Sequence, residues 1–145
     1  MSKYLSQSVV SLASYKGKRR FFACSGIITE LNGCTVVVTL ATLVRDHFDE
    51  NKVDENLRID VLLPDKQHTQ DTLQHYHLHY NIAIVSFKGS CALSTANLYD
   101  AGALSSTRVE AVGRCFESGM LMATRGKLTR WHWRSTFDCS PILLL

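Results

Sequence analysis

FFACSGIITELNGCTVVVTLATLV, residues 21–44, is the stretch on which the fold depends. Its two apolar runs, Phe21–Thr29 and Cys34–Thr39, are rich in the β-branched and aromatic residues that favour strands. Between them stands Leu31-Asn32-Gly33, and an Asn-Gly pair accepts the positive φ angles of a tight hairpin turn. The stretch therefore predicts a β-hairpin.

Short strands bounded by polar or turn residues are expected along the rest of the chain. They are Ser6–Ser14, Leu57–Leu63, Thr72–Tyr80, Ile82–Phe87, Thr107–Gly113 and Met120–Leu128. The expected loops and turns are Tyr15–Arg20, His47–Asn56, Pro64–Asp71 and the connector Ser94–Ala103. Thr42–Phe48 is expected to contain a short helical turn. Helices over Thr39–His47 and Leu93–Leu104 are an alternative, but they are too short to set the fold. The pattern predicts an all-β barrel or sandwich.

The composition is that of one globular domain. The chain has 145 residues, of which 46% are hydrophobic and 20% charged, so a core can form and disorder is not expected. The net charge of +3 is too small to indicate a nucleic-acid or membrane partner by itself. No signal segment is visible, and no apolar run approaches the roughly 18 residues of a membrane span.

The five cysteines are Cys24, Cys34, Cys91, Cys115 and Cys139. Their number is odd and they include no CxxC pair, so we expect reduced thiols in a cytoplasmic or nuclear protein.

The central hairpin carries a motif. Ser25-Gly26 and two apolar residues are followed by the turn and then by a strand ending in Thr39-Leu40-Ala41-Thr42-Leu43-Val44. This order resembles the trypsin/chymotrypsin-like serine proteases, and most of all their Do-like (HtrA/Deg) branch as found in plants, with its Thr-x-x-His-Val-Val. The resemblance implies a trypsin-like six-stranded β-barrel. It also puts Thr42 at the position of the catalytic histidine.

A second motif follows 39 positions later. In the resembling family the catalytic aspartate begins an Asp-Ile-Ala-apolar strand, and here Asn81-Ile82-Ala83-Ile84 stands in its place. The histidine of a triad takes the proton of the serine, and the carboxylate orients that histidine. Thr42 and Asn81 can do neither near neutral pH, so the resemblance implies degenerate triad positions.

The resemblance also implies how the domain is divided. We expect one protease-fold domain over residues 1–145, with a first barrel at about 6–90, the start of a second barrel at 91–130 and a tail outside the family pattern at 131–145. The opening hairpin of the second barrel would be Val109–Arg114 and Leu121–Leu128. The Gly-x-Ser-Gly-Gly motif of the nucleophile does not occur, so the chain is expected to be truncated.

A histidine-rich segment is the first of several other candidates. On a strand, His75, His77 and His79 would share one face, with Tyr76, Leu78 and Tyr80 on the other. They could bind Zn²⁺, but successive residues on one face lie about 6.6 Å apart, which is wide for a shared ion. A polar outer face is the preferred interpretation, and no metal or cofactor is predicted.

The remaining candidates are nucleophilic and nucleic-acid-binding residues. Cys139 or Cys115 could replace the serine, but Asp138 would disfavour a thiolate at Cys139, so structural cysteines are preferred. His47 is interpreted as a solvated side chain rather than a displaced base. A nucleic acid could bind to aromatic and basic residues; these are Trp131, Trp133, Arg130, Arg134, Lys16, Lys18, Arg19 and Arg20.

Three hypotheses follow for function. The first is a catalytically inactive, truncated protease-like protein with a role in protein binding or regulation. The second is a member of an active serine endopeptidase family whose serine motif lies in a longer product. The third is a basic, aromatic nucleic-acid-binding barrel. Because half a second barrel would leave strand edges unpaired, we expect a protein partner or self-association, no membrane contact, and nucleic acid only as the less favoured ligand.

Overall fold

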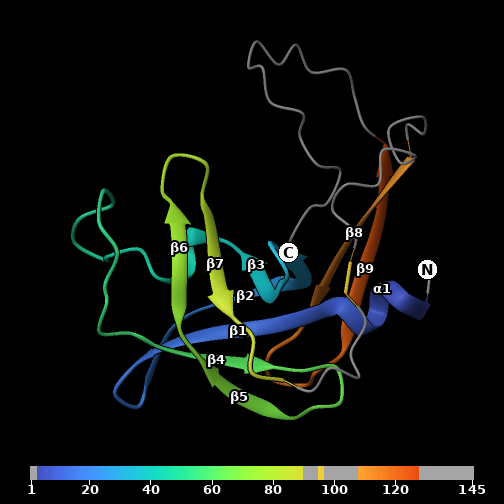
Figure 1. The fold of residues 1–145 in the computed structure, drawn as a ribbon, viewed down its shortest axis with the longest axis horizontal. Coiled ribbons are helices and arrows are strands. Elements are labelled where there is room, and N and C mark those ends of the chain that lie inside the picture. Colours follow the sequence, from blue (N-terminus) through green and yellow to red (C-terminus); the bar gives the residue numbers. More distant parts are fainter. Residues whose placement is uncertain (1–2, 90–94, 97–107, 128–145) are drawn as a thin grey trace.

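The computed structural model describes residues 3–89, 95–96 and 108–127 (Figure 1). These residues are all-β apart from one short helix and one 3₁₀ turn. The elements are α1 (Lys3–Ser8), β1 (Val9–Lys16), β2 (Arg19–Leu31), β3 (Cys34–Thr39), η1 (Ala41–Leu43), β4 (Arg58–Leu62), β5 (His68–Asp71), β6 (Leu73–His77), β7 (Ile82–Ser86), β8 (Arg108–Arg114) and β9 (Leu121–Lys127). This confirms the all-β prediction.

Seven of the strands form one curled antiparallel sheet in the order β5-β4-β1-β2-β3-β7-β6 (Figure 1). Its two outer strands, β5 and β6, are separated in sequence only by Thr72, so one segment pairs with β4 at one edge and with β7 at the other. The Ser86 N–H donates to the Thr72 carbonyl at 2.8 Å, and the Lys88 N–H donates to the Asp71 carboxylate at 3.0 Å. These bonds fix the corner where the segment bends.

The central hairpin is confirmed. β2 and β3 pair in the register Ile27 with Val38 and Leu31 with Cys34. Asn32 and Gly33 both have positive φ angles, 51° and 78°, as a two-residue primed turn requires. β2 begins at Arg19, earlier than the sequence pattern indicates, because it also pairs with β1 down to the Gly17 turn.

Several predicted boundaries are wrong. Ser6–Ser8 belongs to α1 rather than to the first strand. The expected loop Pro64–Asp71 contains β5, whose mostly polar sequence conceals an edge strand paired to β4. The strand predicted over Thr72–Tyr80 ends at His77, because the chain turns there into β7. A helix over Thr39–His47 is reduced to η1, whereas the strands predicted near β4, β7, β8 and β9 are present.

The interior of the curled sheet is a continuous apolar cluster. Its buried members are Val10, Leu12, Cys24, Ile28, Val37, Leu43, Val44, Ile59, Val61, Leu63 and Val85. Gly26 lies in this packing: a β-carbon there would come within 2.6 Å of Leu12 Cδ1 and 2.7 Å of Val37 Cγ1. The glycine therefore lets β2 approach its neighbours closely.

β8 and β9 form a separate two-stranded sheet, here called the ribbon, which packs against the outside of the curled sheet. Val112 on β8 and Leu121 on β9 contact Val9 and Ile27, forming a second and smaller apolar cluster. None of the helices among the described residues has the length and apolar character needed to cross a bilayer.

Candidate functional site

Thr42 and Asn81, which the resemblance predicts to stand at triad positions, lie next to each other. Thr42 is in η1, directly after β3, and Asn81 is the last residue of the turn before β7. β3 pairs with β7, with Thr39 opposite Ala83, so the end of one strand meets the start of the other. The Ala41 N–H also donates to the Asn81 carbonyl at 3.2 Å.

Thr42 and Asn81 are joined by two hydrogen bonds. Asn81 Oδ1 accepts from the Thr42 backbone N–H at 2.8 Å and from the Thr42 hydroxyl at 2.9 Å. Both side chains are neutral near physiological pH and half-buried. The pair can hold η1 against the turn, but it contains no group that would accept or release a proton near neutral pH.

Asn81 adopts a left-handed backbone conformation, with φ of 55°. Asparagine is among the few residues apart from glycine that visit this region readily. Its N–H donates to the Leu78 carbonyl at 3.2 Å, and Arg45 Nη2 donates to the same carbonyl at 3.0 Å. The turn is therefore held by a bond within itself and by one from Arg45, in the loop that follows η1.

A cavity of about 630 Å³ opens beside Thr42. It is lined by residues of the β1–β2 hairpin, η1 and the following loop: Lys16, Arg19, Arg20, Phe21, Phe22, Thr42, Arg45, Asp46, His47, Phe48 and Glu50. Sequence reasoning considered the basic hairpin and His47 separately and missed Phe48 and Arg45. No spacing in the sequence indicates that the β1–β2 hairpin meets the loop after η1. The only signal in the sequence was the charged composition of that loop.

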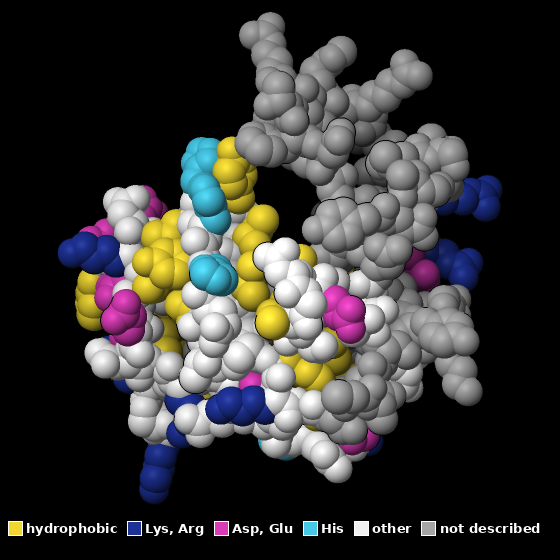
Figure 2. Space-filling model, viewed as in Figure 1, with side chains coloured by type: hydrophobic (Ala, Val, Ile, Leu, Met, Phe, Trp, Pro, Cys, Tyr) yellow, Lys and Arg dark blue, Asp and Glu magenta, His cyan; other side chains and the backbone are white. Residues whose placement is uncertain are grey.

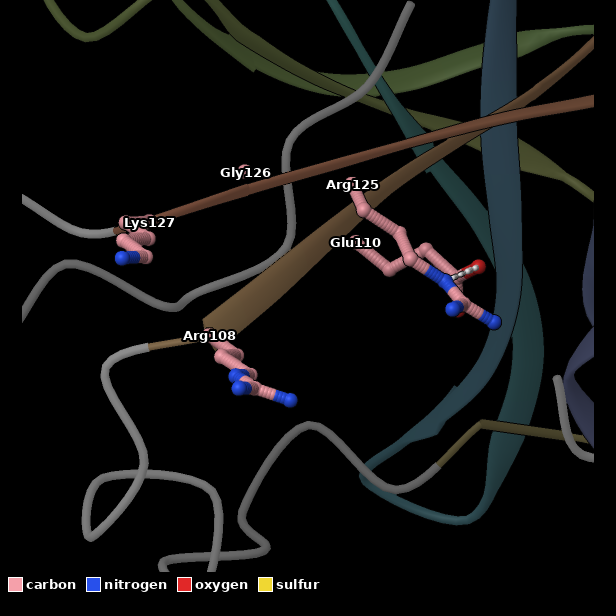
Figure 3. A pocket seen from close by; sticks show the side chains of 5 residues that line it. All are labelled: Arg108, Glu110, Arg125, Gly126 and Lys127. Atoms are coloured by element: carbon pink, nitrogen blue, oxygen red, sulfur yellow. Dashed lines mark ion pairs between the residues drawn. The ribbon is translucent and has the colours of Figure 1, made fainter.

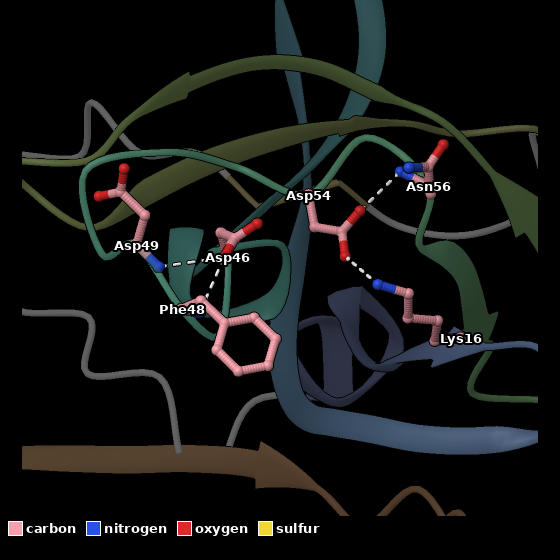
Figure 4. A network of polar contacts seen from close by, with 6 residues as sticks. All are labelled: Lys16, Asp46, Phe48, Asp49, Asp54 and Asn56. Atoms are coloured by element: carbon pink, nitrogen blue, oxygen red, sulfur yellow. Dashed lines mark hydrogen bonds and ion pairs between the residues drawn. The ribbon is translucent and has the colours of Figure 1, made fainter.

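Aspartates fix the loop that borders this cavity (Figure 4). Asp46 Oδ1 accepts from the backbone N–H of Phe48 at 2.7 Å and of Asp49 at 3.0 Å. Asp54 accepts from the Asn56 N–H at 2.9 Å and pairs with Lys16 at 3.2 Å, which ties the loop to the hairpin. The Asn56 hydrogen bond and then Lys16 lower the pKa of Asp54.

The histidine-rich segment differs from the prediction. His75 and His77 lie on β6, but His79 is in the turn, so the three do not share one strand face. Tyr76 and Tyr80 are 48% and 44% exposed and do not form an inner face, because β6 is an edge strand that is exposed along most of its length. Among the described residues no group of His, Cys, Asp or Glu is arranged to hold a metal ion.

The described cysteines are thiols in unlike surroundings. Cys115 is half-buried, and its Sγ donates to the Glu117 carboxylate at 3.2 Å. Cys24 is buried, and burial raises its pKa. Cys34 is an exposed free cysteine. The two remaining cysteines and the tryptophan cluster lie outside the described residues, namely Cys91, Cys139 with Asp138, and Arg130, Trp131, Trp133 and Arg134.

A second cavity, of about 640 Å³, lies at the far end of the ribbon (Figure 3). It is lined by Arg108, Glu110, Arg125, Gly126 and Lys127, and Arg125 Nε lies 3.8 Å from Glu110 Oε1. The Arg125 side chain is 86% exposed, so solvent screens this pair.

The chain matches no protein-family model and no curated protein.

Proposed function

We propose that this chain is a catalytically inactive protein of the trypsin-like, Do-like serine protease type, and that its role is to bind other proteins rather than to cleave them. The proposal rests on one observation. Thr42 and Asn81, which stand at the histidine and aspartate positions of the resembling motifs, are 39 residues apart and share two hydrogen bonds.

The sheet topology supports the proposal. The segment containing β5 and β6 pairs with both β4 and β7, as expected if six strands close into a barrel with that segment bent at Thr72. In the same scheme the ribbon corresponds to the opening hairpin of a second barrel. Both features are consistent with a trypsin-like arrangement.

The chemistry of the pair argues against hydrolysis. A serine nucleophile needs a base that takes its proton, and neither a threonine hydroxyl nor an asparagine amide does so near neutral pH. In a serine protease whose triad is otherwise intact, loss of the carboxylate alone lowers turnover by about 10⁴-fold. Here the position of the base is changed as well, so a serine supplied from elsewhere would still lack its activation.

The exposed side of the ribbon is the surface that we assign to a protein partner. Met122 on β9 and Met120, directly before it, are 44% and 66% exposed, and within the described part of the chain β8 pairs only with β9. Methionine-rich surfaces and unpaired strand edges are both suited to protein contacts.

Hydrolysis of unfolded casein and labelling by an active-site-directed phosphonate test the proposal. We expect no labelling and no turnover above that of the Thr42→Val variant, which serves as the control for contaminating protease. Labelling that is lost on heat unfolding, together with turnover that Thr42→Val abolishes, would contradict it.

A further inference from the structure

Phe48 is the most exposed large hydrophobic residue among those described, with 94% of its surface accessible. It is not isolated. Its ring lies 5.3 Å from the His47 ring, and the His47 ring lies 5.5 Å from that of Phe21. The three rings form a row along the rim of the cavity beside Thr42.

The loop that carries Phe48 is held in place. Asp46 accepts hydrogen bonds from the Phe48 and Asp49 N–H groups, and the Lys16–Asp54 ion pair ties the loop to the β1–β2 hairpin (Figure 4). The exposure of the phenyl ring is therefore not the result of a loose loop. A preorganised aromatic side chain loses little conformational freedom when a partner covers it, which favours binding.

Charges of both signs surround the rings. Figure 2 shows hydrophobic side chains beside basic and acidic ones on the side of the molecule where the loop after η1 lies. Arg20 is paired with Glu117 and Lys16 with Asp54. Arg19 and Glu50 line the same cavity, and neither takes part in an ion pair within the described residues.

We propose that this surface, made of Arg19, Phe21, His47, Phe48 and Glu50, is a self-complementary interface between two copies of the chain. Phe48 of each copy enters the cavity of the other, and Arg19 of each copy pairs with Glu50 of the other. In a two-fold interface the same patch of both copies meets, and every contact occurs twice. A patch with a protruding ring, a cavity, one cation and one anion is therefore complementary to a second copy of itself.

Other partners fit this surface less well. Of the cations at the cavity, Lys16 and Arg20 are already paired with carboxylates, and the Asp46 and Glu50 carboxylates line the same cavity, which makes it a poor site for a nucleic-acid backbone. A partner surface with charges of only one sign would leave either Arg19 or Glu50 unpaired. The five residues of this surface lie outside the ribbon, and the interface does not depend on the proposed function.

Sedimentation of the 145-residue chain over a range of concentrations tests the proposal. We expect a reversible dimer, weakened about 30-fold or more by Phe48→Ser, because truncation of a central aromatic residue removes a dominant share of binding. Tyr76→Ser, which changes an exposed aromatic residue of the edge strand β6, is the matched control and should leave the dimer intact.

Charge reversal identifies the interface. Arg19→Glu and Glu50→Arg should each weaken self-association, because each places like charges opposite one another. A mixture of the two variants should form 1:1 heterodimers with affinity close to that of the wild-type dimer, since each cross-pair then joins opposite charges. A chain that stays monomeric at all concentrations would overturn the proposal, as would a dimer that persists unchanged in Phe48→Ser or a mixture that does not pair. Thermal unfolding of each variant verifies that it is folded.

Discussion

The interactions that stabilise the curled sheet differ in kind from those that attach the ribbon to it. The interior of the sheet is a continuous apolar cluster, whereas the ribbon is attached by a small apolar cluster and by one buried arginine. β2 serves both regions. Ile28 is fully buried in the interior, and its neighbour Ile27, on the opposite face of the strand, packs against the ribbon.

Arg114 is the centre of the attachment. It is only 7% exposed, and its guanidinium donates to the carbonyls of Val9 at 2.7 Å, Gly119 at 2.7 Å and Ser6 at 2.6 Å. Its backbone N–H donates to the Ser25 hydroxyl at 2.9 Å. None of the ion pairs among the described residues includes it, and burial lowers its pKa.

The two regions therefore depend on sequence in different ways. Apolar packing is non-directional and tolerates many residue choices, so the interior is specified by pattern. The ribbon has only a small apolar cluster, and directional hydrogen bonds from one buried side chain add to it, so its attachment depends on Arg114 in particular.

The largest expected effect comes from the adjacent isoleucines. Ile28→Ala should lower the free energy of unfolding by about 4 kcal/mol, because it leaves a cavity in the main cluster. Ile27→Ala should lower it by about 2 kcal/mol, because its cluster is smaller and can close around the gap. Urea denaturation of both variants measures the difference. Equal losses, or a larger loss for Ile27→Ala, would show that the two clusters do not differ in this way.

Arg114→Met should have an intermediate effect, a loss of about 2 kcal/mol, because methionine fills the space but leaves buried carbonyls without donors. Hydrogen exchange should accelerate at β8 and β9 and stay nearly unchanged at β2 and β3. Arg125→Met, on the exposed side of the ribbon, is the matched control and should change stability little. Uniform acceleration across β2, β3 and β8 would mean that the two regions unfold together.

The smallest expected effect is a pH dependence at the turn between β8 and β9. Arg20 and Cys115 hold the pKa of Glu117 at about 2, below its ordinary value of 4.5. Because the folded-state pKa is depressed, the Arg20–Glu117 contribution is present above about pH 4.5 and is lost as the pH falls towards 2. Both side chains are well exposed, so the change should be slight. Relative to the intrinsic exchange rate at each pH, amide exchange of the turn at residues 115–119 should therefore rise over this range in the wild type and not in Glu117→Gln.

Local patterns predicted the elements that depend on local chemistry. The Asn32-Gly33 turn and the strands beside it could be predicted from the sequence, because a two-residue turn needs positive φ angles that few residues accept. β5 could not be predicted from the sequence, because an edge strand with exposed His68 and Gln70 has the composition of a loop. Its identity comes from pairing with β4, which no local signal records.

Only part of the candidate site could be predicted from the sequence. Motif spacing singled out Thr42 and Asn81, and the structure brings them within hydrogen-bond distance; their correspondence to triad positions stays a prediction. The role of Arg114 could not be predicted, because its acceptors Val9 and Ser6 lie 105 and 108 positions away in the sequence. The cavity that joins Phe48 to Arg19 depends on the same kind of distant contact.

One NMR measurement tests whether Thr42 and Asn81 occupy the positions of a protease base and its carboxylate. It compares the imidazole pKa of the single variant Thr42→His with that of the double variant Thr42→His, Asn81→Asp. If the correspondence holds, the added carboxylate stabilises the imidazolium, and the pKa in the double variant should exceed that in the single variant by about one unit or more. The same imidazole pKa in both variants would contradict the correspondence and, with it, the proposal that this chain is an inactive protease-like protein.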